Sequence, residues 1–186
     1  MPEIGRRGVH ALGAAIPLAW LLGLAPWRWV EWFLCGGLAL GVVLESLRLT
    51  GRAEWRIYDE LTREYEREKP AGYFLYAVGM TVTGLCFPPL VAAPAMLLLA
   101  LADPFSGMLY AGGLGRKPLP VMLATFGLCL VIALTTGVPP LPAGLGALGA
   151  TLADGVTPTV RGHVIDDNLT IPIVAAAAMW VGFQFV

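Results

Sequence analysis

Long apolar stretches, separated by short breaks rich in Pro, Gly or charge, dominate the pattern of this chain. A membrane-spanning helix needs about 20 mostly apolar residues. We expect such helices at roughly residues 9–26, 29–49, 72–88, 90–110, 119–137, 141–157 and 169–186. The pattern therefore predicts one all-α domain over residues 1–186, a polytopic membrane helix bundle with about seven transmembrane helices.

Residues 52–69 form the one long polar stretch in the sequence. Trp55, Tyr58 and Tyr65 recur at helical spacing within it, and the remaining positions are rich in Glu and Arg. This predicts a cytoplasmic amphipathic helix that lies on the lipid headgroups. A flap over a membrane-embedded site, or a contact for an anionic substrate, is the functional alternative.

The composition agrees with a membrane protein. Hydrophobic residues make up 57% of the chain and charged residues 13%, against about 25% charged in ordinary soluble domains. The mean hydropathy is +0.72, which excludes a water-soluble enzyme and an intrinsically disordered chain. The net charge of −1 gives no indication of nucleic-acid binding.

The Lys and Arg residues predict the orientation, because cytoplasmic loops carry an excess of them. With the N-terminus in the cytoplasm, all of the 12 basic residues except Arg28 fall on the cytoplasmic side, and the C-terminus ends outside. The expected location is integral to the membrane, the plasma membrane in a prokaryote, with the active site cytoplasmic. Arg6 and Arg7 before an apolar run resemble a signal peptide, but no small-residue cleavage site follows.

Several common kinds of site are not indicated. Cys35, Cys86 and Cys129 lie in apolar runs without metal-ligand spacing, and we interpret them as small buried hydrophobic residues. No phosphate-binding GxxxxGK[ST] pattern occurs. Gly37 and Gly41 form a GxxxG pattern that favours close helix packing and leaves a homodimer open.

Asp103 stands out because it lies within an apolar run and is followed at once by Pro104. An ionised Asp within a membrane span costs about 2.5–3.5 kcal/mol on insertion scales. We therefore expect Asp103 to face a cavity at a break in its helix, and a structural pair with an Arg is the alternative.

Further acidic residues map to the cytoplasmic ends of the predicted spans, together with basic ones. The acidic residues are Glu45, Asp154, Asp166 and Asp167. The basic residues and His are Arg6, Arg7, His10, Arg48, Arg116, Lys117 and Arg161, with Gly115 as flexible backbone beside two of them. Two carboxylates about 5 Å apart repel by roughly 3 kcal/mol at an effective dielectric constant of 20, so a gathered set either becomes protonated or holds a hard divalent cation. Carboxylates that hold Mg²⁺ next to cationic side chains suit phosphoryl transfer.

The segment VIDDNLTIP at residues 164–172 resembles the C-terminal signature of the dolichol kinase, phytol kinase and CTP-dependent diacylglycerol kinase family. RRGVH at 6–10, ESLR at 45–48, LADPFSG at 101–107 and GRK at 115–117 resemble further family elements in the same order. Asp154 stands where the family usually has Glu. The serine-containing element that usually follows the family lysine is replaced here by PLP at 118–120.

The resemblance implies an integral membrane kinase that uses CTP and Mg²⁺ to phosphorylate a lipid alcohol, of the polyprenol, dolichol, geranylgeraniol or phytol type. It implies that Asp103, Asp166 and Asp167 hold Mg²⁺, and that Asn168 orients a phosphate or completes the metal shell. Asp103 or Asp154 would accept the hydroxyl proton. The triphosphate would be bound by Arg6, Arg7, His10, Arg48, Gly115, Arg116 and Lys117.

Two alternatives stay open at this point. A cytidylyltransferase that forms a CDP-lipid would use the same nucleotide and metal. A small membrane transporter, with broken helices and a buried Asp along its pathway, belongs to a different class.

Overall fold

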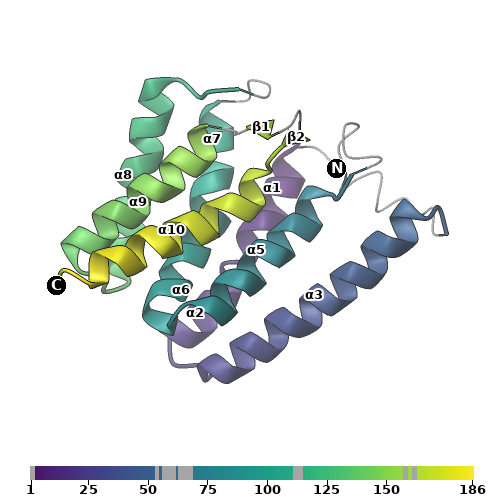
Figure 1. Ribbon diagram of the computed structural model, residues 1–186, viewed down its shortest axis with the longest axis horizontal. Coiled ribbons are helices and arrows are strands. Elements are labelled where there is room, and N and C mark those ends of the chain that lie inside the picture. The colour runs from purple at the N-terminus through teal and green to yellow at the C-terminus, as the bar shows by residue number, and fades with distance from the viewer. Residues whose placement is uncertain are drawn as a thin grey trace.

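The computed structural model confirms that the part of the chain it describes is all-α, apart from one pair of two-residue strands (Figure 1). It describes residues 3–52, 55, 62, 69–110, 115–156, 159–160 and 163–186, without the side chains of residues 3–6, 159–160 and 163–164. The amphipathic helix expected at 52–69 lies almost entirely outside the described residues.

The first expected span, residues 9–26, is broken into two short helices, α1 (Glu3–Leu12) and α2 (Ala15–Leu21). Pro17 lacks the N–H that would bond to the carbonyl of Gly13 in a continuous α-helix. That carbonyl instead accepts from the nearer N–H of Ile16, at 3.2 Å. The chain therefore turns between α1 and α2.

The long helix α3 (Trp27–Leu49) lies at one edge of the bundle (Figure 1). It packs on α2 and on α5 (Gly72–Cys86). Its other side leaves large apolar residues exposed, among them Trp29, Trp32 and Phe33. Contiguous apolar surface of this kind marks a contact with a membrane or with another protein.

The centre of the bundle is one continuous helical stretch built from α6 (Pro89–Leu97), η2 (Leu98–Ala102) and α7 (Asp103–Leu109). Residues 91–100 are all buried, and α2, α5, α8 and α10 pack around α6 and η2. The break expected at Pro104 is present as a distortion, because η2 is a π-helical segment directly before Asp103. Such π-helical segments occur often at functional sites.

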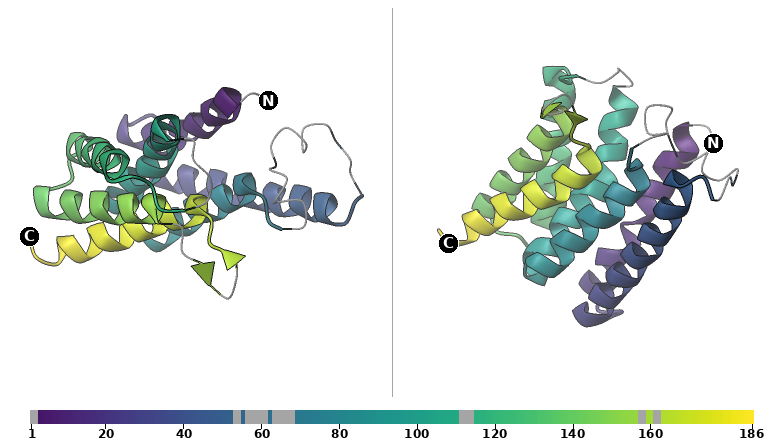
Figure 2. Two further views of the ribbon diagram at one scale, coloured as in Figure 1. Left: turned by 90° about the horizontal axis from the view of Figure 1, so that it is seen from above. Right: turned by 45° about the vertical axis from the view of Figure 1, so that its right-hand side comes forward.

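The last part of the fold is a pair of antiparallel helices, α9 (Pro140–Gly155) and α10 (Asp167–Phe183), with α8 (Leu119–Thr135) beside α9 (Figures 1 and 2). Strands β1 (Thr159–Val160) and β2 (His163–Val164) lie between α9 and α10 in the chain and pair antiparallel. Glycines let α9 and α10 approach closely, since a Cβ on Gly182 would lie 2.7 Å from Cα of Pro142. The start of α9 is thereby held beside the end of α10.

Two helices in the described part of the chain are long and apolar enough to cross a membrane, namely α3 and the continuous helix Pro89–Leu109. The second of these is mostly buried inside the bundle. Three other expected spans form apolar helices of 15, 17 and 17 residues, α5, α8 and α10, which are shorter than the usual 20 or so. The seven-span count and its orientation remain predictions.

Candidate active site

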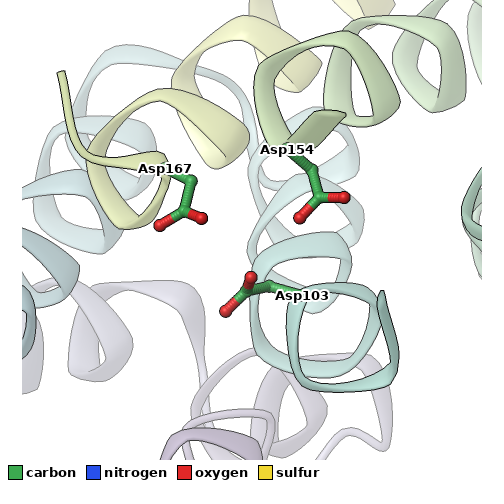
Figure 3. Close-up of side chains that lie close together, drawn as sticks. All are labelled: Asp103, Asp154 and Asp167. Atoms are coloured by element: carbon green, nitrogen blue, oxygen red, sulfur yellow. The ribbon is translucent and has the colours of Figure 1, made fainter. Parts of the chain in front are cut away.

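Three carboxylates from three separate parts of the chain come together at one end of the bundle (Figure 3). Asp103 opens α7, Asp154 lies near the end of α9, and Asp167 opens α10. One oxygen from each lies within 4.8 Å of the others. At an effective dielectric constant of 20, two unit charges at that separation repel by roughly 3 kcal/mol, and nearby positive charge or a proton on one carboxyl would relieve this repulsion.

The fold explains why these three residues meet. The β1–β2 hairpin reverses the chain, so that the end of α9 and the start of α10 share one end of the bundle. The π-helical segment η2 packs against α8, α9 and α10, and Asp103 follows it directly. The cluster is therefore set by helix packing.

Lys117 supplies positive charge to one carboxylate of the cluster. Its Nζ donates to Asp154 Oδ1 at 2.6 Å and to Ser106 Oγ at 2.8 Å, and Ser106 Oγ donates to Asp154 Oδ2 at 2.7 Å. Asp154 is 2% exposed and Ser106 is fully buried. The backbone N–H of Lys117 donates to the carbonyl of Gly155 at 3.0 Å, which ties the lysine to the end of α9.

Ser106 is a residue whose role the sequence did not indicate. The family that the chain resembles usually has a serine after this lysine, whereas Pro118 follows Lys117 here. The hydroxyl that contacts Lys117 comes from α7 instead. The LADPFSG segment contains Ser106 one helical turn after Asp103, and that spacing is the signal that could have identified it.

Asp166 and Asn168 lie next to the cluster and contact each other. Asp166 is the N-cap of α10, and its Oδ1 accepts from the backbone N–H of Asn168 at 3.0 Å and from Asn168 Nδ2 at 2.7 Å. The carboxylates that the structure groups are thus Asp103, Asp167 and Asp154, and Asp166 is not among them. Asn168 Oδ1 is buried without a hydrogen-bond partner among the described atoms.

Helix α1 brings His10 and Arg7 to the side of the cluster, because α1 packs against η2 and α7. His10 Nε2 lies 3.2 Å from the carbonyl oxygen of Leu99 and 3.6 Å from Asp103 Oδ2. The guanidinium of Arg7 lies against α7, since a Cβ on Gly107 would be 3.4 Å from Arg7 Nη2. The side chain of Arg6 lies outside the described residues.

Arg48 takes part in an ion pair at the junction of α3 and α5. It donates to Glu45 at 2.9 Å and 2.6 Å, and to the carbonyl of Lys69 at 2.6 Å. Glu45 also accepts from the backbone N–H of Ala71 at 2.8 Å and from the hydroxyl of Tyr73. These bonds fasten the end of α3 to the start of α5, and the expected nucleotide contact of Arg48 stays a prediction.

Gly115 and Arg116 are exposed and directly precede Lys117. Their position next to a residue that contacts Asp154 places them at the end of the bundle where the cluster lies. Their expected contact with a nucleotide also stays a prediction.

Comparisons of the chain with protein-family models, with curated proteins and with solved structures give no match.

The donor set fits a hard divalent cation. All three grouped ligands are carboxylate oxygens, the donors that Mg²⁺ and Ca²⁺ prefer, and no sulfur or imidazole belongs to the group. Lys117 offsets one of the three negative charges through Asp154. A divalent cation would offset the other two and relieve the repulsion between Asp103 and Asp167.

Proposed function

We propose that this protein is an integral membrane kinase that transfers a phosphoryl group from CTP to a lipid alcohol of the polyprenol, dolichol, geranylgeraniol or phytol type. The observation that carries the proposal is the group of Asp103, Asp154 and Asp167 at the end of a bundle with a largely apolar surface. Phosphoryl transfer depends on positioning and on charge stabilisation, which such a group and its cationic neighbours supply. The family resemblance of residues 164–172 supplies the choice of CTP and of a lipid alcohol.

In this proposal Asp103 and Asp167 hold Mg²⁺, with Asp154 beside them. Bound Mg²⁺ would neutralise charge on the phosphates of the nucleotide. Lys117 orients Asp154 and adds one positive charge at the cluster. Arg7, held against α7, and Arg116, next to Lys117, would contact the triphosphate from two sides.

The acceptor hydroxyl must lose its proton to a base within reach. Asp103 has the more accessible carboxylate, with its side chain 20% exposed, whereas both oxygens of Asp154 already accept hydrogen bonds from Ser106 and Lys117. We therefore assign proton acceptance to the Asp103 oxygen that would not hold Mg²⁺. The lipid tail would lie along the apolar helices, and the seven-span orientation would put the cluster on the cytoplasmic side.

The test uses purified protein in lipid nanodiscs with Mg²⁺, a panel of lipid alcohols, and CTP labelled at either the γ- or the α-phosphate. We expect γ-label in a lipid phosphate, separated by thin-layer chromatography. Asp167→Asn should reduce this transfer by more than about 100-fold, because it removes the charge of one ligand and keeps its shape. Glu31→Gln, which removes a carboxylate from α3, is the matched control and should retain activity.

The other outcomes separate the alternatives. The appearance of α-label in the lipid would identify a cytidylyltransferase that forms a CDP-lipid. A protein that neither transfers label nor binds CTP in the presence of Mg²⁺ would contradict both enzymatic functions and favour a transporter.

A further inference from the structure

One carbonyl group in the central helix loses its helical hydrogen-bond donor. In a π-helix the carbonyl of residue i bonds to the N–H of residue i+5. Five residues after Leu99, within the turn that follows η2, stands Pro104, which has no N–H. Leu99 is fully buried, so water cannot replace the missing donor, and a buried carbonyl normally has a partner.

His10 supplies that partner from α1. Its Nε2 lies 3.2 Å from the carbonyl oxygen of Leu99. A carbonyl oxygen only accepts, so Nε2 carries the proton in this contact. The same Nε2 lies 3.6 Å from Asp103 Oδ2, and one N–H therefore faces both the Leu99 carbonyl and the Asp103 carboxylate.

The imidazole is held in place from the other side by Tyr76. The two rings pack edge to face, with centroids 4.4 Å apart, and the Tyr76 hydroxyl donates to the backbone carbonyl of His10 at 3.3 Å. Gly13 provides the space, since a Cβ there would lie 1.9 Å from the Tyr76 hydroxyl oxygen. These contacts fix the orientation of the His10 imidazole, and with it the direction of the Nε2–H bond.

We propose that His10 is a positioning residue for Asp103. With a proton on Nε2, it satisfies the Leu99 carbonyl and fixes the turn of helix that carries Asp103. It thereby keeps the Asp103 carboxylate directed at Asp154 and Asp167. This inference rests on the proposed role of Asp103 as a metal ligand, and it gives His10 a different role from the nucleotide contact that the family resemblance implied.

The test compares His10→Gln with His10→Met, two side chains of similar length of which only Gln can donate to the Leu99 carbonyl. Binding of Mn²⁺ alone, without nucleotide, is measured by electron paramagnetic resonance of the purified protein. We expect His10→Met to weaken Mn²⁺ binding by about 10–100-fold, the usual effect of losing a hydrogen bond that orients a ligand. His10→Gln should stay within about threefold of the unchanged protein, since it retains that hydrogen bond.

Unchanged Mn²⁺ affinity in His10→Met, or an equal loss in both variants, would overturn the inference. A His10 variant whose only change is a higher KM for CTP at saturating Mg²⁺ would also overturn the inference, because that result indicates a nucleotide contact. If His10→Met does not fold, Tyr76→Phe serves instead. It removes the hydroxyl that holds the His10 backbone, and a twofold to fivefold weaker Mn²⁺ affinity is expected. An unchanged Mn²⁺ affinity would contradict the proposal.

The failure of this inference is distinguishable from the failure of the proposed function. Asp103-dependent Mn²⁺ binding without any phosphoryl transfer would refute the kinase and leave the role of His10 intact. Transfer activity combined with a His10→Met variant of normal Mn²⁺ affinity would refute the role of His10 alone. A protein that binds no Mn²⁺ would refute both.

Discussion

Two neighbouring aspartates at the start of α10 have different surroundings. Asp166 accepts the N-terminal hydrogen bonds of the helix, whereas Asp167, one residue later, belongs to the carboxylate cluster. Adjacent helical residues point about 100° apart, so both cannot face the same neighbours. A cap needs only a short acceptor, and Ser, Thr, Asn and Asp all serve.

This difference predicts that Asp166→Ser is tolerated. Serine should preserve the cap, leaving the thermal unfolding midpoint and phosphoryl transfer within a few-fold of the unchanged protein. Asp166→Ala should cost about 1 kcal/mol of stability, the usual effect of losing a cap. Thermal unfolding and the transfer assay together check this, and a 100-fold loss of transfer in Asp166→Ser would assign Asp166 to metal binding after all.

At the scale of elements, the position of Asp167 depends on how closely α5 approaches the first turn of α10. A Cβ on Gly79 would lie 2.6 Å from the backbone oxygen of Asn168 and 3.3 Å from Cα of Leu169. Backbone atoms cannot move aside as a flexible side chain can. At Gly79, therefore, α5 packs directly against the backbone of the turn that carries Asp167, and this contact determines where that turn lies.

We expect Gly79→Ala to push the start of α10 away and to reduce transfer activity by at least about tenfold, since small misplacements of reacting groups have large kinetic effects. Gly127→Ala in α8 is the matched control, because nothing lies within 4 Å of its added Cβ. That change should leave activity unaltered and add a little helix propensity. Equal activity of the two variants, measured at saturating Mg²⁺, would show that α10 tolerates the displacement.

The sequence predicted the all-α fold class and the positions of most helices, because apolar runs and prolines determine where a helix begins and ends from the local sequence alone. It also singled out Asp103, since a charge within an apolar run is costly unless it has a role, and the family resemblance of residues 164–172 added Asp166 and Asp167. It did not distinguish Asp166 from Asp167, because capping depends on where the first turn begins. The contact between Ser106 and Lys117 depends on how α7 and the start of α8 pack, which no local pattern encodes.

For the whole molecule, the exposed apolar side of α3 and the buried helix Pro89–Leu109 are the features that bear on the membrane. The grouped Asp103, Asp154 and Asp167 lie instead at one end of the bundle, the end where α1 begins and the β1–β2 hairpin lies (Figure 1). The predicted orientation puts that end in the cytoplasm and the turn after Cys86 outside.

Chemical labelling can test this orientation. In a variant whose only cysteine is Cys86, which is exposed at the end of α5, a membrane-impermeant maleimide should react from outside intact cells. A variant whose only cysteine comes from Arg116→Cys should react only in inverted vesicles. Labelling of both variants from the same side would contradict the predicted topology, and labelling of both in detergent provides the control.

The three grouped aspartates have a consequence for how the protein matures. Asp103 is synthesised well before Asp154 and Asp167, and its partners arrive only when α9 and α10 have been made and packed against η2. A chain still emerging from the ribosome therefore carries isolated carboxylates with low affinity for metal. Under the proposed function, its capacity to bind a cation, and with it any reactivity toward nucleotides, would begin only at a late stage of assembly.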